Sequence, residues 1–202
     1  SGRGFWILDD LGAIQQSKGT LGTTKKVTIF TPKPAVKAFF GGRSRGSNLG
    51  KNPEDGVLID YYLPEKMDTM DLKLDILDLS GTVIRTYTNK KDKSFKRYEG
   101  GPGPKKVLPA KKGLNRVAWN MRRNAIPGIP NVFVNGGYGG SSVAPGNYKI
   151  RLTANGEVVE TEAVILADPR LKVTAADFTQ QQQLLTQIDD VLLDMHSSVN
   201  RM

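Results

Sequence analysis

Hydrophobic and polar residues alternate along several stretches of the chain, which is the pattern of β-strands that bury one face. The alternation is strictest over residues 71–78, where Leu72, Leu74 and Ile76 are separated by charged residues. The pattern predicts strands at residues 57–63, 71–78, 82–87, 113–119, 148–152 and 158–166.

Turn residues separate these strands. Asn155 and Gly156 suit the type I′ turn of a tight hairpin between the last two strands. Residues 78–81 form another turn, and Pro145 with Gly146 supplies a preset φ followed by a residue that tolerates positive φ. Short strands with little helix among them predict a mainly β fold, an antiparallel β-sandwich of roughly seven strands. We place it at residues 53–168.

Trp119 is the predicted centre of the core. Because side chains alternate along a strand, Val117 and Trp119 point to the same face. Tyr148, which opens the strand at 148–152, is the second predicted core aromatic. Asn115 is expected to bind neighbouring backbone through its amide as the chain enters the strand.

The C-terminal residues carry the strong helix signal. Thr174 and Asp177 have the spacing of a capping box. Apolar residues then recur every three, four or seven positions, at Phe178, Leu184, Leu185, Ile188, Val191, Leu192, Met195 and Val199. This one-sided stripe has three candidate partners: the sandwich, a second copy of the chain (helix-mediated self-association), or a helix beyond Met202.

Residues 13–52 are predicted to be a linker. Residues 27–30 form one plausible short strand, which Pro32 and Pro34 interrupt, and residues 41–52 are polar and rich in glycine.

Positive charge is concentrated in residues 89–116, which hold ten basic and two acidic residues in a chain of net charge +9. Aromatic residues lie among the lysines, so this segment could bind a phosphate backbone, an anionic glycan or an acidic partner. A solvated connection is the preferred interpretation, since no nucleic-acid motif accompanies the segment. The candidate ligand or partner surface comprises Lys90, Lys91, Lys93, Phe95, Lys96, Arg97, Tyr98, Phe133 and Tyr138.

Phe133 and Tyr138 belong to residues 121–142, which combine apolar residues with many glycines. An exposed apolar loop of this kind could bind a glycan or a protein edge. We favour a segment that folds back over the sandwich, because so many apolar groups favour burial.

Catalytic and metal-binding patterns are weak, and we expect no catalytic residues, no metal site and no cofactor. The chain has no cysteine, and its single histidine, His196, is expected on the helix surface. Residues 46–52 and 136–140 are glycine-rich but lack the spacing of a phosphate or dinucleotide loop. Asp9 and Asp10 end the first apolar stretch, and Asp71, Asp75 and Asp78 are expected on the solvent face of a half-buried strand rather than in a hydrolase cleft.

Three groups of residues carry a family resemblance. Residues 80–87, Gly113-Leu114-Asn115 with Trp119, and residues 145–148 together resemble the immunoglobulin-like domain of the flagellar hook-capping protein. The opening, residues 2–11, resembles the last strand of a BNR or sortilin-like β-propeller, and residues 168–170 resemble the exit from the sandwich in the same bacterial proteins. Those proteins are often labelled glycosyl hydrolases.

The resemblance implies an immunoglobulin/fibronectin-III-like antiparallel β-sandwich with a C-terminal α-helix. Residues 1–12 would be the remnant of a propeller strand, 13–52 the linker, 53–168 the sandwich and 169–202 the helix, in a piece of a longer extracytoplasmic bacterial protein. The implied role is that of a non-catalytic accessory domain whose partner is the upstream propeller. The alternatives are a carbohydrate- or polyanion-binding module and the non-catalytic part of a glycoside hydrolase. No apolar stretch is long enough to span a membrane.

Overall fold

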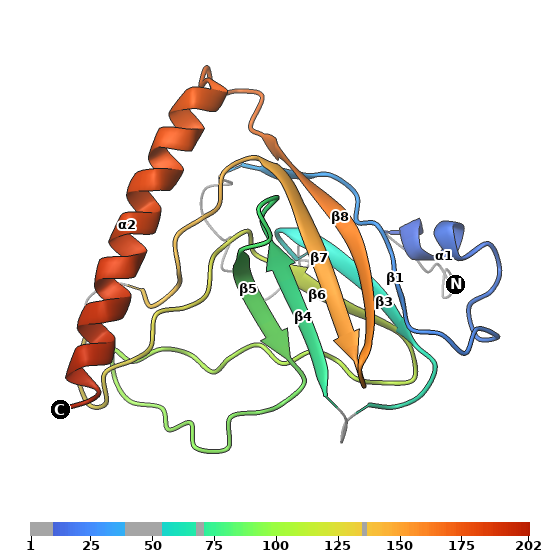
Figure 1. The fold of residues 1–202 in the computed structure, drawn as a ribbon, viewed down its shortest axis with the longest axis horizontal. Coiled ribbons are helices and arrows are strands. Elements are labelled where there is room, and N and C mark those ends of the chain that lie inside the picture. The colour runs from blue at the N-terminus through green and yellow to red at the C-terminus, as the bar shows by residue number, and fades with distance from the viewer. Residues whose placement is uncertain (1–9, 39–53, 68–70, 135–136) are drawn as a thin grey trace, which may run out of the picture.

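The fold is mainly β, with two sheets and a long C-terminal helix (Figure 1). The computed structural model describes residues 10–38, 54–67, 71–134 and 137–202. The six strands predicted from the alternation pattern are all present, each within two residues of its predicted ends at both termini.

The smaller sheet has the order β1 (Thr28–Ile29), β3 (Val57–Leu63) and β6 (Gly113–Trp119), and its pairings are antiparallel. The larger sheet has the order β2 (Ala35–Lys37), β8 (Glu157–Ala167), β7 (Gly146–Ala154), β4 (Leu72–Leu77) and β5 (Val83–Thr88). Its pairings are antiparallel except for β2, which runs parallel to β8.

Two of the three predicted turns, at Asn155-Gly156 and at residues 78–81, are confirmed, whereas Gly146 already belongs to β7 and pairs with Ile165. Asn155 and Gly156 both have positive φ, of 48° and 86°, and Ala154 pairs with Glu157 across the hairpin. These are the signs of φ that a type I′ turn requires. Before β5, Gly81 has a φ of 89° and the Asp78 carboxylate accepts the N–H of Thr82, so the β4–β5 turn is fixed by its own residues.

The core lies between the two sheets, and Trp119 is fully buried within it. The indole meets the Tyr148 ring edge to face, with centroids 5.3 Å apart and an angle of 74° between the planes. The polar groups of both side chains are hydrogen-bonded: the Trp119 indole N–H donates to the Arg122 carbonyl, and the Tyr148 hydroxyl donates to the Ala144 carbonyl. The predicted core aromatics are therefore confirmed, as is the predicted role of Asn115, whose amide binds the backbone of Lys111.

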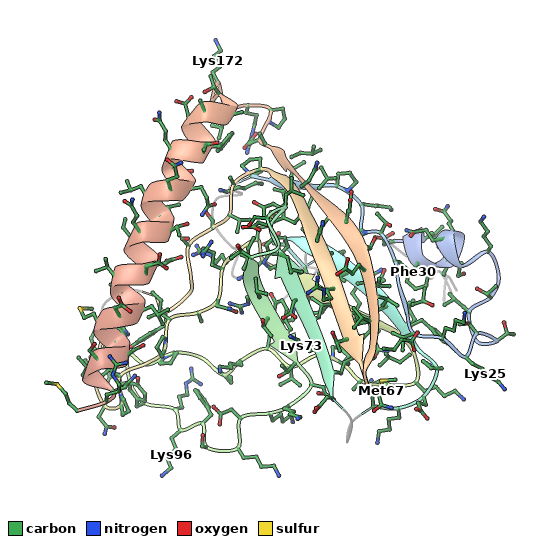
Figure 2. All side chains as sticks on the ribbon, viewed as in Figure 1. Lys25, Phe30, Met67, Lys73, Lys96 and Lys172 are labelled. Atoms are coloured by element: carbon green, nitrogen blue, oxygen red, sulfur yellow. The ribbon has the colours of Figure 1, made fainter. Side chains whose placement is uncertain are left out.

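The segment before the sandwich contains a helix and two strands rather than one short strand. Helix α1 (Gly12–Ser17) is followed by β1 in the smaller sheet and β2 in the larger one. Ala13 and Phe30 pack on Tyr62, which points out of the smaller sheet. Strand β3 is consequently covered on both faces, in agreement with its nearly continuous apolar sequence. Figure 2 shows Phe30 lying between α1 and the strands.

The alternation pattern predicted Asp75 on the solvent face of the strand. That prediction is wrong, because Asp75 is only 2% exposed. It lies on the outer side of β4, where the Thr86 hydroxyl donates to it at 2.7 Å and the Lys73 ammonium lies 2.7 Å away. Lys73 on the same strand and Thr86 on the neighbouring strand therefore cover a carboxylate that strand periodicity alone places in water.

Helix α2 (Ala175–Val199) runs beside the sandwich (Figure 1). Its predicted capping box is confirmed: the Thr174 hydroxyl accepts the N–H of Asp177, and the Asp177 carboxylate accepts the N–H of Thr174. Among the described residues no helix is long and apolar enough to cross a membrane.

Candidate functional site

The candidate site is a layer formed by residues 121–144 and α2, on the β5 side of the larger sheet. Asn124 extends the edge of β5, because its N–H donates to the Ile84 carbonyl at 2.9 Å and its side-chain oxygen accepts the Thr86 N–H at 3.0 Å. The Arg85 guanidinium donates to the Arg123 carbonyl. The 121–144 segment thus covers an exposed strand edge, which would otherwise invite pairing with another chain.

A column of polar residues attaches α2 to this segment. Gln182, Asp189 and His196 are spaced by seven positions and therefore share one helix face. The Gln182 oxygen accepts the Ala144 N–H at 2.7 Å, and Asp189 accepts the Ser141 hydroxyl at 2.6 Å. Three apolar side chains beside this column are half-buried: Phe178, Leu185 and Leu192.

Asp189 also lies 3.5 Å from the Arg123 guanidinium, and at the C-terminal end of α2 the Asn200 amide donates to the Gly128 carbonyl. The helix is therefore attached along its length, mainly by hydrogen bonds.

His196 is buried at 6% exposure, which contradicts the predicted surface position. Its Nδ1 lies 2.8 Å from the Pro127 carbonyl oxygen, and its ring meets Tyr138 edge to face with centroids 5.8 Å apart. Because a carbonyl is an acceptor, we assign the proton to Nδ1. The signal for this position is the seven-residue spacing with Gln182 and Asp189, which marks a docking face where polar residues lie beside the half-buried apolar ones.

The structure brings together two segments that the sequence analysis treated separately. Tyr98 lies against Gly101 and Gly128, where a β-carbon would come within 2.6 Å of the tyrosine. Phe133 lies against Gly100 in the same way. These glycines therefore permit the close approach of residues 98–103 to the 121–144 segment. Burial, with Tyr138 nearby, raises the pKa of Tyr98 above its ordinary value.

The predicted ligand surface is only partly accessible. Tyr138 is 7% exposed and Tyr98 is half-buried, so neither ring offers an open stacking face. Phe133, by contrast, is 63% exposed. Residues 121–144 hence cover the sandwich in part, as favoured, with Ile126 and Tyr138 buried while Phe133 remains in solvent.

The basic part of the predicted surface is exposed. Lys91, Lys93, Lys96 and Arg97 face solvent, Phe95 is half-buried, and Lys90 forms an ion pair with Asp71. Figure 2 shows the Lys96 side chain extending away from the ribbon.

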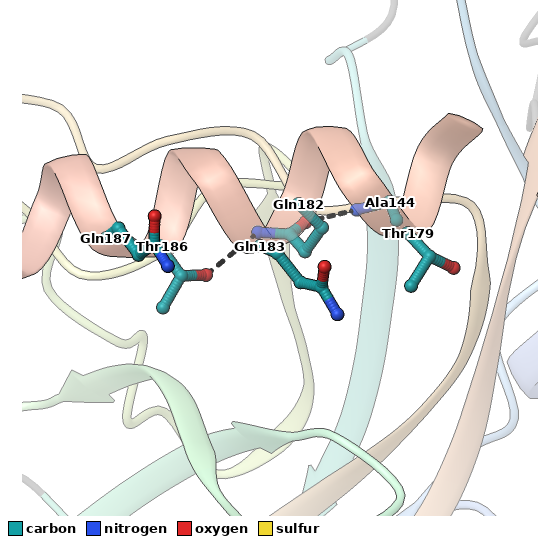
Figure 3. Close-up of a pocket in the computed structure, with 6 residues that line it drawn as sticks. All are labelled: Ala144, Thr179, Gln182, Gln183, Thr186 and Gln187. Atoms are coloured by element: carbon teal, nitrogen blue, oxygen red, sulfur yellow. Dashed lines mark hydrogen bonds between the residues drawn. The ribbon is translucent and has the colours of Figure 1, made fainter. Parts of the chain in front are cut away.

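A shallow groove of about 400 Å³ lies beside the N-terminal half of α2 (Figure 3). Its lining comprises Ala144, Thr179, Gln182, Gln183, Thr186 and Gln187, and the surface that these side chains present to the groove is mostly apolar. The Gln182 amide is held at both ends, by the Ala144 N–H and, at 3.4 Å, by the Thr186 hydroxyl. The lining therefore offers few free polar groups and no aromatic ring for stacking.

Two carboxylates lie close to α1, each with a cationic partner. Arg116 donates to both oxygens of Asp60, at 2.7 and 2.8 Å. The Gly12 N–H and the Lys33 ammonium lower the pKa of Asp10 below its ordinary value. The cavity between them holds about 10 Å³, too little for a substrate. Asp60 and Arg116 join β3 to β6, and Asp10 joins Gly12 to Lys33, so each carboxylate is paired within its own part of the fold.

The remaining sequence candidates lie partly outside the described residues, and the described ones form no metal-binding group. Within the described ranges, no three His, Cys, Asp or Glu side chains form a group that could hold a metal ion. Asp9 and the glycine-rich residues 46–52 lie outside the described residues, as does Gly136 in the other glycine-rich candidate.

No family model, no curated protein and no solved structure matches this chain. The resemblance to the hook-capping and propeller proteins accordingly stays a prediction from the residues named above.

Proposed function

We propose that this chain is a non-catalytic accessory domain of the immunoglobulin/fibronectin-III-like type, located on the C-terminal side of a secreted bacterial β-propeller protein. In that position it fixes the orientation of the propeller and offers surfaces for interaction. Two packed, mainly antiparallel sheets around a buried tryptophan support the sandwich type.

One observation carries this proposal: the N-terminal segment is built into both sheets. β1 pairs with β3 in the smaller sheet and β2 pairs with β8 in the larger one. Gln16 adds a two-way link to the backbone of Thr31, at 2.9 Å in each direction. A loose linker would leave an upstream domain free to rotate, whereas a segment paired this way transmits a fixed orientation.

The test is binding of the chain to the separately expressed upstream propeller, by calorimetry at low and high salt, beside a panel of glycans. We expect binding to the propeller that persists at high salt and no glycan binding. Absence of binding between the propeller and the chain at both salt concentrations would contradict the accessory role.

A carbohydrate- or polyanion-binding module is the second candidate, favoured by the exposed Lys91, Lys93 and Lys96 and by the exposed Phe133. Its test is binding to anionic glycans by a variant with these three lysines changed to glutamine. The matched control changes Lys25, Lys26 and Lys172, which are equally exposed but lie elsewhere; Figure 2 shows Lys25 and Lys172 far from Lys96. Salt-sensitive binding lost in the first variant alone favours the module over the accessory domain.

A further inference from the structure

Two basic side chains, one from each sheet, meet at one end of the sandwich. Lys37 is the last residue of β2, in the larger sheet, and Arg122 lies just beyond the end of β6, in the smaller sheet. The Lys37 ammonium donates to the Val143 carbonyl at 2.7 Å. The Arg122 guanidinium donates to the Gly140 carbonyl at 3.0 Å. The fold therefore brings both cations to the same short segment, residues 140–143.

Neither cation forms an ion pair with a carboxylate among the described residues. The neighbouring Arg123, by contrast, lies 3.5 Å from Asp189. Residues 38–53, which follow Lys37 in the chain, contain three basic and no acidic residues. Within the described part of the chain, the two positive charges are therefore held by neutral carbonyls and lack a counter-charge.

This arrangement carries an electrostatic cost. Burial and the nearby Arg122 charge lower the pKa of Lys37 below its ordinary value, because both effects disfavour the charged amine. Long basic side chains normally avoid such repulsion by extending separately into water. Here the hydrogen bonds to residues 140–143 hold both charged ends in place. A doubly charged anion that binds both groups would replace the repulsion with two attractive contacts.

A third hydrogen-bond donor lies next to Arg122. Arg122 and Ser142 form an antiparallel bridge, so their side chains project from the same side of the backbone. Ser142 is half-buried, and its hydroxyl has no hydrogen-bond partner among the described residues. Arg122 is exposed, which leaves the site open to a solute. An ammonium, a guanidinium and a hydroxyl are donors that suit the oxygens of a phosphate or sulfate group.

We propose that Lys37 and Arg122, with the Ser142 hydroxyl as a third donor, bind a doubly charged tetrahedral oxyanion of the phosphate or sulfate type. A free ion and an ester group share this chemistry. The proposal goes beyond the accessory role, because it requires no propeller, and it does not involve the basic residues 90–97.

The test adds sodium sulfate to the 202-residue chain at constant ionic strength and follows the lysine ε-CH₂ and arginine δ-CH₂ signals by NMR. We expect saturable shifts of the Lys37 and Arg122 signals and little change at the other lysines. The Lys37 amine should also titrate at higher pH in sulfate than in chloride, because a bound anion favours the charged form.

Variants locate the contact, with the remaining cation as the NMR probe. Lys37→Gln and Arg122→Gln should each weaken sulfate binding at least about tenfold, the loss expected when a charge-assisted hydrogen bond is removed. The matched control is Lys149→Gln, which should change binding less than twofold. Lys149 is also half-buried in the larger sheet, but it stands opposite Glu162. Because Arg122 is exposed, its variant keeps the test decisive even if Lys37→Gln does not fold.

Three results overturn the proposal: sulfate shifts that grow without saturation, equal losses of binding in Arg122→Gln and Lys149→Gln, or equal affinity for sulfate and the singly charged acetate. Glucose 6-phosphate and glucose 6-sulfate distinguish the two sources of the oxyanion. An ester that binds as tightly as sulfate supports a site for the phosphate or sulfate group of a larger ligand. Esters that bind at least about tenfold more weakly assign the site to the free ion.

Discussion

Two arginine–carboxylate pairs occupy equivalent positions in the two sheets and differ in burial. Asp60 stands directly opposite Arg116 in the smaller sheet, and Arg151 stands directly opposite Glu160 in the larger one. The Asp60 carboxylate is 7% exposed and accepts two hydrogen bonds, whereas the Arg151 and Glu160 side chains are 42% and 44% exposed and share one at 2.6 Å. Burial should therefore separate their contributions to stability.

The expected coupling energies follow from these exposures. An exposed ion pair contributes about 0–1 kcal/mol, since water and salt screen it. Removing one partner of a fully buried pair costs about 3–5 kcal/mol. Because the Arg116 side chain is 38% exposed, we discount that figure and expect a coupling of about 1.5–2 kcal/mol between Asp60 and Arg116. For Arg151 and Glu160 we expect at most about 0.5 kcal/mol.

The assay is a pair of double-mutant cycles. Alanine replaces each member of each pair singly and both together, and urea unfolding is followed by tryptophan fluorescence. In a chain of this length 1 kcal/mol corresponds to a shift of about 2–4 °C in Tm, so thermal unfolding provides a second readout. Equal coupling energies in the two cycles would refute the reasoning that burial of Asp60 strengthens its pairing with Arg116.

Three further predictions concern backbone, charge and helix attachment. Gly81→Ala should lower the free energy of unfolding in urea by about 1–2 kcal/mol, because alanine would have to adopt the positive φ of this position. Gly56→Ala should lower it by about 3–5 kcal/mol, because in addition to the positive φ the new β-carbon would lie 2.1 Å from a backbone carbonyl oxygen of β6. Hydrogen bonds from Arg170 lower the pKa of Asp168 to about 2, so its contribution to stability is complete above about pH 4 and is lost as pH falls towards 2. Arg170→Gln should therefore raise the Asp168 pKa in a carboxyl NMR titration, and an unchanged pKa would contradict this. Asp189→Asn should speed hydrogen exchange in residues 141–144 while leaving the amides of β4 and β7 protected; uniform acceleration would mean that α2 is part of the global unfolding unit.

Sequence patterns were enough to predict those features of the fold that a few neighbouring residues determine. Strand β4 was predictable because Leu72, Leu74 and Ile76 report directly which face meets the core. The Asn155-Gly156 turn was predictable because its required φ angles select those residues. Each of these features is decided within a few residues of the chain.

The missed features depend on residues far apart in sequence. Strand β2 has three residues and follows two prolines, and its parallel partner in β8 lies about 130 positions later. Asp75 is outward by periodicity yet buried by Lys73 and Thr86. His196 was placed on the surface because an amphipathic helix normally turns its polar side to water.

On α2 that rule holds only in part, because the polar column of Gln182, Asp189 and His196 docks on the chain together with half-buried apolar side chains. Its docking face is fastened by hydrogen bonds that each contribute about 0.5–1.5 kcal/mol, whereas full burial of one aliphatic side chain is worth about 1.5–3 kcal/mol. Because the exposed apolar side chains of α2 are already about half covered, burying them further would be worth no more than the contacts that attach the helix now, which include several hydrogen bonds and the half-buried Phe178, Leu185 and Leu192.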